Sequence, residues 1–155
     1  MNWLIDLITN PFLITSTSSW FIAQDIKTIL TGIINKKWTL ERMVGDGGMP
    51  SGHSATVSSL AMFSALYYGV GSFQFAVCAI LAIIVCHDAM GVRLETGKQA
   101  VLLNEIVKAF EILSKEELPE VKLKEFVGHT PIQVLVGITI GILNALVMYF
   151  WVFCP

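Results

Sequence analysis

The strongest constraint on this chain is the length of its charge-free apolar runs. Residues 54–71 contain no Asp, Glu, Lys or Arg. A helix of that length rises about 27 Å, which is close to the thickness of a bilayer's hydrocarbon core. Only 14% of all residues are charged and 54% are hydrophobic, a composition too apolar for an ordinary soluble domain. The sequence therefore predicts an all-α integral membrane protein with a single domain over residues 1–155.

Three further apolar segments extend this prediction to a bundle of three to four transmembrane helices. Residues 73–86 follow after a short break and form a hairpin with the first run, and residues 132–153 form a third span. Residues 12–34 are mainly apolar but contain Gln24 and Lys27, and we expect a fourth span there. These two side chains lie about one helical turn apart, where they could reach a ligand, although a lysine near the end of a span often extends to the headgroups.

Residues 94–113 have a different pattern, in which apolar residues at helical spacing alternate with charged ones. This pattern is typical of an amphipathic helix on a membrane surface. Within the last span, Asn144 is expected to form an interhelical hydrogen bond. The three cysteines have no Cys-x-x-Cys spacing, so we expect no metal and no cofactor.

The positive charges indicate an orientation. If residues 54–86 form a hairpin, the segments before and after it lie on one side of the membrane. These segments hold nine of the ten basic residues: Lys36, Lys37, Arg42, Arg93, Lys98, Lys108, Lys115, Lys122 and Lys124. By the positive-inside rule, this face is cytoplasmic in a bacterial-type plasma membrane.

A loop of glycine, proline, serine and histidine leads directly into the first apolar run, as "GDGGMPSGHS" over residues 45–54. The unpaired N–H groups of the first helical turn point into this loop, and Ser51 is available as the cap. Gly48 and Gly52 allow the backbone to approach a ligand, and the helix dipole favours a phosphate-like charge. The loop with His53 is therefore a candidate anion site, or else a glycine-rich connection with an interfacial histidine.

A second histidine precedes another span. His129 lies just before Thr130, a suitable N-cap, and Pro131, which suits the first helical position. Both histidines therefore lie at helix starts on one face, together with cationic side chains. This combination is suited to phosphoryl transfer with one histidine as nucleophile and the other as acid. The candidate phosphate-binding cations are Lys27, Lys36, Lys37, Arg42 and Arg93.

The segments "GGMPSGHSA" and "GHTPIQVLVG" resemble the second and third signature motifs of the type 2 phosphatidic acid phosphatase superfamily, which is related to vanadium haloperoxidases. Residues 87–105 resemble the middle signature of its divergent branch of small membrane proteins. The resemblance implies that His129 attacks phosphorus and that His53 protonates the leaving oxygen. It also implies that Ser51 and Gly52 bind phosphate.

The sequence departs from the superfamily's motifs at three places. Lys36 and Arg42 are one residue closer than in the first motif, and the arginine expected before the third-motif histidine is Leu123 here. Arg93 is the candidate replacement. The aspartate expected four residues after the histidine is Gln133, which can orient an imidazole but cannot stabilise an imidazolium by charge.

Asp88, at the end of the hairpin's second helix, is a candidate for the missing carboxylate, although it could instead pair with Arg93 and anchor the helix end. The sequence thus predicts a metal-independent phosphatase acting on a lipid phosphate such as phosphatidate or phosphatidylglycerophosphate. The bilayer and this lipid are the expected partners. Nucleic acid is not a partner, and a homo-oligomer is compatible with the chain. The alternative is a non-catalytic protein that binds or translocates lipid phosphates.

Overall fold

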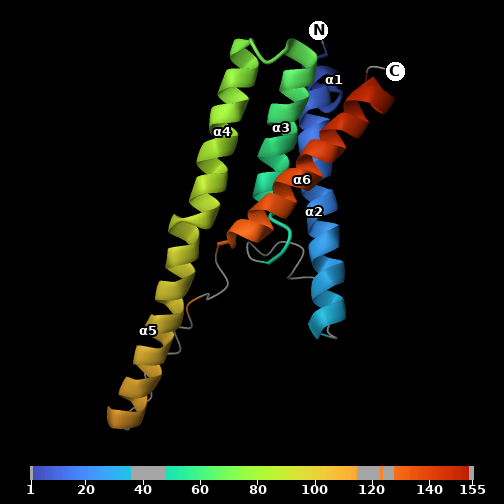
Figure 1. Cartoon of the computed structure of the whole chain (residues 1–155). Helices are drawn as coiled ribbons and strands as arrows, with labels where there is room; N and C mark the ends of the chain where they lie inside the picture. The colour runs from blue at the N-terminus through green and yellow to red at the C-terminus, as the bar shows by residue number, and fades with distance from the viewer. Residues whose placement is uncertain (1, 36–47, 115–122, 124–127, 154–155) are drawn as a thin grey trace.

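The computed structural model describes residues 2–35, 48–114, 123 and 128–153, and they form an all-α structure (Figure 1). Its elements are α1 (Trp3–Ile8), α2 (Pro11–Asn35), α3 (Gly52–Tyr68), α4 (Phe73–Met90), α5 (Val92–Ser114), α6 (Pro131–Val147) and a final π-helical segment, η2 (Met148–Phe153). The predicted all-α class is confirmed.

Each apolar run of the sequence coincides with a long helix, and the expected amphipathic segment forms α5. Within the described residues, two helical stretches are long and apolar enough to cross a membrane, namely Phe73–Leu113 and Pro131–Phe153. Helix α3 has only 17 residues, and α2 carries several polar side chains. The count of three to four spans therefore stays a prediction.

Small and polar side chains fill the interior of the bundle, while large apolar ones face outward. Thr15, Ser19 and Ser59 are fully buried, whereas Ile83 and Trp151 are largely exposed. A water-soluble domain has the opposite distribution, because burial of large apolar side chains drives its folding. The distribution seen here suits a bundle whose outer surface contacts lipid and whose helices associate through small residues.

Helices α3 and α6 pack with their backbones in close approach. A Cβ atom on Gly137 would lie 2.4 Å from the Ser51 carbonyl oxygen, and one on Gly141 would lie 2.3 Å from that of Ala55. The spacing of four residues places both glycines on one face of α6. Because neither glycine has a side chain, α6 can lie directly against the first turns of α3.

The hairpin of α3 and α4 places the start of α3 and the start of α6 at the same end of the bundle (Figure 1). Helix α2 packs against both α3 and α6. The Asn144 amide of α6 donates hydrogen bonds to the Thr15 carbonyl and to the hydroxyls of Ser18 and Ser19 on α2. The predicted interhelical role of Asn144 is confirmed.

Helix α5 follows α4 after Gly91 and extends away from the other helices (Figure 1). Its Asn104 side chain exchanges two hydrogen bonds with the backbone of Leu123. Further along the chain, Gly128 has a φ of 87° and lies against the first turn of α5, where a Cβ would come within 2.3 Å of the Leu94 nitrogen. These contacts hold the approach to α6 against the junction of α4 and α5.

We expect Gly141→Ala to destabilise the bundle by about 1–3 kcal/mol, because the new methyl group would overlap the backbone of α3. The measurement is thermal unfolding of the purified protein in detergent. Gly71→Ala is the matched control, since a Cβ at Gly71 meets no atom within 4 Å. Equal melting temperatures for the two variants would contradict the close packing of α3 and α6.

Candidate functional site

His129 is held in a fixed position just before α6. Its side chain is only 2% exposed, and its backbone N–H donates a 3.0 Å hydrogen bond to the Ala89 carbonyl at the end of α4. The ring Nδ1 lies 3.0 Å from the carbonyl oxygen of Gly48. Gly48 has a φ of 93°, a conformation that glycine adopts without strain. Three separate segments thus determine where the imidazole lies and how it is turned.

The contact with Gly48 determines the tautomer of the His129 ring. A carbonyl oxygen can only accept, so Nδ1 must carry the proton and, in the neutral ring, Nε2 presents a lone pair. This Nε2 is buried and has no hydrogen-bond partner among residues 2–35, 48–114, 123 and 128–153. An unsatisfied buried acceptor costs about 1–3 kcal/mol, so the free lone pair indicates a position where a ligand atom binds.

The surroundings of His129 also favour the neutral ring. Burial lowers the pKa of the His129 imidazole, and the charges of Lys27 and His53 act in the same direction. The nearby Gln133 side chain and the Gly48 carbonyl oppose this shift in pKa only in part. At neutral pH the ring is therefore uncharged, with its lone pair on Nε2.

The start of α3 provides backbone donors at the same place. Ser51 is the N-cap, and its side chain accepts from the Ser54 N–H at 3.3 Å. The backbone N–H of Ser51 donates to the Gln133 carbonyl at 3.1 Å, which joins the two motifs directly. Helix geometry directs the first-turn N–H groups of Gly52 and His53 toward the preceding loop. The positive end of the helix dipole therefore lies beside His129.

Helix α2 contributes a row of three side chains to this end of the bundle. A Cβ on Gly52 would lie 3.3 Å from Trp20 Cδ1 and 3.5 Å from Gln24 Nε2, and one on Gly48 would lie 3.7 Å from Lys27 Cγ. The Lys27 side chain is only 3% exposed, and its charge acts on His129. Lys27 is thus a buried basic side chain whose stem lies beside the loop residue that holds His129.

His53 lies on the opposite side of a small hollow from the end of α4. The hollow has a volume of ≈ 210 Å³ and is lined in part by His53, Asp88 and Arg93. Arg93 Nε donates to Asp88 Oδ2 at 2.7 Å, and both side chains are partly exposed. Asp88 therefore pairs with Arg93, and the partner of the His129 Nδ1 is the Gly48 carbonyl.

Gln133 closes the first turn of α6. Its side-chain oxygen accepts from the Thr130 N–H at 3.0 Å, while the Thr130 side chain accepts from the Gln133 N–H at 3.5 Å. This reciprocal pair is a capping box, with Pro131 at the start of the helix. The predicted cap at Thr130 is confirmed, and Gln133 also contacts the imidazole that it was predicted to orient.

The structure thus brings together His129, Gly48, Ser51, Gly52 and Lys27, with His53, Asp88 and Arg93 at one side. Three predicted phosphate ligands, Lys36, Lys37 and Arg42, lie outside the described residues.

Sequence reasoning missed two features that position His129. The first is the Ala89 carbonyl, which accepts the hydrogen bond from the His129 N–H. Every residue has a backbone carbonyl, so the residue type at position 89 does not indicate this role. The second is the contact of Gly128 with α5, which could have been inferred from the glycine directly before the histidine.

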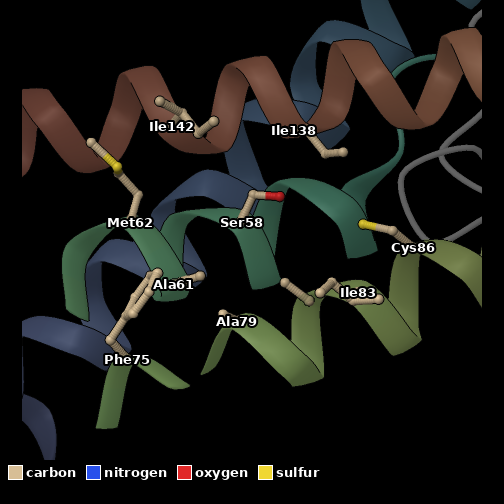
Figure 2. A pocket seen from close by; sticks show the side chains of 10 residues that line it. Ser58, Ala61, Met62, Phe75, Ala79, Ile83, Cys86, Ile138 and Ile142 are labelled. Atoms are coloured by element: carbon tan, nitrogen blue, oxygen red, sulfur yellow. The ribbon is translucent and has the colours of Figure 1, made fainter. Parts of the chain in front are cut away.

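A separate apolar groove lies between α3, α4 and α6 (Figure 2). Its volume is ≈ 380 Å³, and side chains from all three helices point into it, including Met62, Phe75 and Ile142. At its other end the groove reaches Cys86, which packs with Ala89 and Val134. The Ala89 carbonyl accepts the hydrogen bond from the His129 backbone N–H, so this end of the groove lies near the segment that holds the histidine.

Taken together, these features define a helical membrane protein with a buried histidine at two adjoining helix N-termini. Residues 8–144 match the model of the Divergent PAP2 family, so the chain belongs to that family. The resemblance of the motifs is thereby confirmed. The chain is 39% identical to the uncharacterized membrane protein YuiD of Bacillus subtilis (strain 168), over 95% of this chain and 99% of that protein. No solved structure matches it.

We expect the His129 imidazole to titrate below the ordinary histidine value of about 6.5, with Nδ1 as its protonated nitrogen. Nitrogen-15 NMR of histidine-labelled protein measures both properties, and the signal is assigned by its loss in His129→Asn. A pKa at or above the ordinary value would contradict the inferred neutral ring.

The same shift in pKa affects stability. As the pH falls below about 6.5, the unfolded chain takes up a proton that the buried ring does not, so the free energy of unfolding declines. The decline should be smaller in His129→Asn, which has no imidazole to protonate.

Proposed function

We propose that this protein hydrolyses a lipid phosphate through a phosphohistidine formed on His129. The observation that supports this most is the buried lone pair on Nε2, set by the contact of Nδ1 with Gly48. A protein that only binds phosphate would present an N–H donor to the anionic oxygens. A lone pair repels those oxygens but is what a nucleophile needs in order to attack phosphorus.

The proposed reaction has two steps. In the first, the Nε2 lone pair forms a bond to phosphorus, the bond between phosphorus and the lipid oxygen breaks, and His53 gives a proton to the leaving alkoxide. In the second, water gives a proton to His53 and attacks phosphorus, and the electron pair of the P–N bond returns to Nε2. His53 is suited to this role because it lies at the start of α3, near enough for its charge to affect His129.

Several groups are placed to stabilise the charge on the phosphoryl oxygens. The first turn of α3 offers the backbone N–H groups of Gly52 and His53, with Ser51 as the cap. The ammonium group of Lys27 adds a positive charge from α2. We assign Arg93 to the lipid side of the phosphate, near His53, and Asp88 to holding the Arg93 guanidinium in place.

The groove between α3, α4 and α6 supports a lipid as substrate. Its lining is almost wholly apolar, and it lies among the helices that carry the site. A hydrocarbon chain in this groove would leave the headgroup at the end of the bundle where α3 and α6 begin. Phosphatidate and phosphatidylglycerophosphate have such chains and fit a cytoplasmic site, which is the orientation that the basic residues predict.

We expect the purified protein to release phosphate from one or more lipid phosphates in the presence of EDTA and to be inhibited by vanadate. His129→Ala should abolish release, because no other group can form the bond to phosphorus. His53→Ala should slow the first step most for substrates with poor leaving groups. Phosphate release is measured against a panel of lipid phosphates.

The third histidine provides the matched control for these variants. His87 lies in the last turn of α4 and is exposed, so His87→Ala should keep the activity of the wild type. Equal activity in the wild type and in His129→Ala would refute the enzyme and leave the alternative, a protein that only binds or moves lipid phosphates.

The orientation can be tested without knowing the substrate. Lys108 on α5 and Val70 in the turn between α3 and α4 are both exposed, and the whole of α4 separates them along the chain. A membrane-impermeant thiol reagent should label Val70→Cys in intact cells and Lys108→Cys only after the cells are opened. The parent protein, with its native cysteines, gives the background labelling, and the reverse pattern would contradict a cytoplasmic site.

A further inference from the structure

Gln24 carries a buried acceptor that no group of the described residues satisfies. Its side chain is only 6% exposed, and its Oε1 has no hydrogen-bond partner in the part of the chain that the structure describes. Ser19 and Asn144 make hydrogen bonds to protein atoms, whereas Thr15 Oγ1 is also unpaired within the described residues but lies near the start of α2. A buried acceptor without a partner is costly unless something else binds to it.

The amide of Gln24 lies at the candidate anion site. Its Nε2 is 3.5 Å from the position of a Cβ on Gly52, the first residue of α3. On the same helix, three residues further on, the Lys27 stem lies beside Gly48, whose carbonyl holds His129. The unpaired oxygen of Gln24 and the unpaired Nε2 of His129 therefore belong to one region at the start of α3.

The two unpaired atoms make different demands on a ligand. The lone pair of His129 Nε2 is directed at phosphorus in the proposed reaction. An ionised phosphate oxygen is an acceptor and cannot satisfy Gln24 Oε1, which needs a donor. In a phosphate site the available donors are O–H groups. One is the acidic hydroxyl of a partly protonated phosphate, and another is the water that attacks the phosphohistidine.

We propose that Gln24 is a ligand-binding residue whose Oε1 accepts a hydrogen bond from an O–H group at the phosphate site. The donor is either the hydroxyl of the bound phosphate or the hydrolytic water. The role of the water rests on the proposed phosphatase activity, whereas the role of the phosphate hydroxyl requires only that the site binds phosphate. Gln24 thereby adds selectivity for protonated phosphate, or orients the water, from a helix outside the two histidine motifs.

The test compares Gln24→Met with the wild type. Methionine has a similar length and no strong acceptor, so it fills the same space in an apolar interior. Thr17→Val is the matched control on α2, because Thr17 is exposed and its hydroxyl bonds only to the backbone of its own helix.

Two measurements separate the two donors. The first is the affinity for inorganic phosphate, and the second is the rate of each step in a single turnover of a labelled lipid phosphate. If the donor is the phosphate hydroxyl, Gln24→Met should weaken phosphate binding about tenfold, as expected for the loss of one hydrogen bond to a charged ligand. If the donor is water, phosphate affinity should stay unchanged, and phosphohistidine should accumulate because its hydrolysis is slowed.

The outcomes also separate this proposal from the proposed function. A wild type that binds phosphate without turnover refutes the phosphatase, and phosphate affinity alone then decides the role of Gln24. Gln24→Met that matches Thr17→Val in both affinity and rates would overturn the proposal, as would a wild type that neither binds phosphate nor releases it. A change in the melting temperature of Gln24→Met with unchanged affinity and rates would show a purely structural residue.

Discussion

The close packing of α3 on α6 is the interaction on which the site depends. With no side chain at Gly137 and Gly141, the backbone of α6 reaches the backbone of α3. At this separation the Ser51 N–H can donate to the Gln133 carbonyl. The first turns of two helices from distant parts of the sequence are thereby fixed side by side, and the histidine at the start of each helix is brought to the same end of the bundle.

The positions of the long helices could be predicted from the sequence, because they follow from local patterns. The placement of both histidines at one end of the bundle then follows from the hairpin. Apolar runs define the helices, Thr130 and Pro131 mark the start of α6, and a hairpin must return the chain to the same side. The partner of His129 could not be predicted in this way. A carboxylate such as Asp88 is visible in a sequence, but the acceptor here is a backbone carbonyl, which every residue has. Only the fold decides which carbonyl faces the ring.

The polar interior lowers the mean hydropathy of two helices, α2 and α3, that the sequence predicts to span the membrane. Helix α2 carries Gln24 and Lys27, and α3 carries four serines, yet most of these side chains are buried among the helices. Each lowers the average hydropathy of its helix without contacting lipid. In a bundle held together by small residues, serine and threonine satisfy their hydroxyls within their own helix and leave room for close approach. The apolar residues of such a helix then indicate only its outward-facing side.

A backbone carbonyl beside His129, where the superfamily motif has a carboxylate, changes the charge balance of the proposed reaction. When Nε2 bonds to phosphorus while Nδ1 keeps its proton, the ring becomes cationic. A carboxylate would neutralise that charge, whereas the Gly48 carbonyl offers only a dipole. Lys27 and burial further disfavour a positive ring. In compensation, the same lysine and the α3 dipole stabilise the phosphoryl oxygens. On this mechanism the intermediate is a zwitterionic phosphohistidine, in which the negative phosphoryl group and the cationic ring stabilise each other until water attacks.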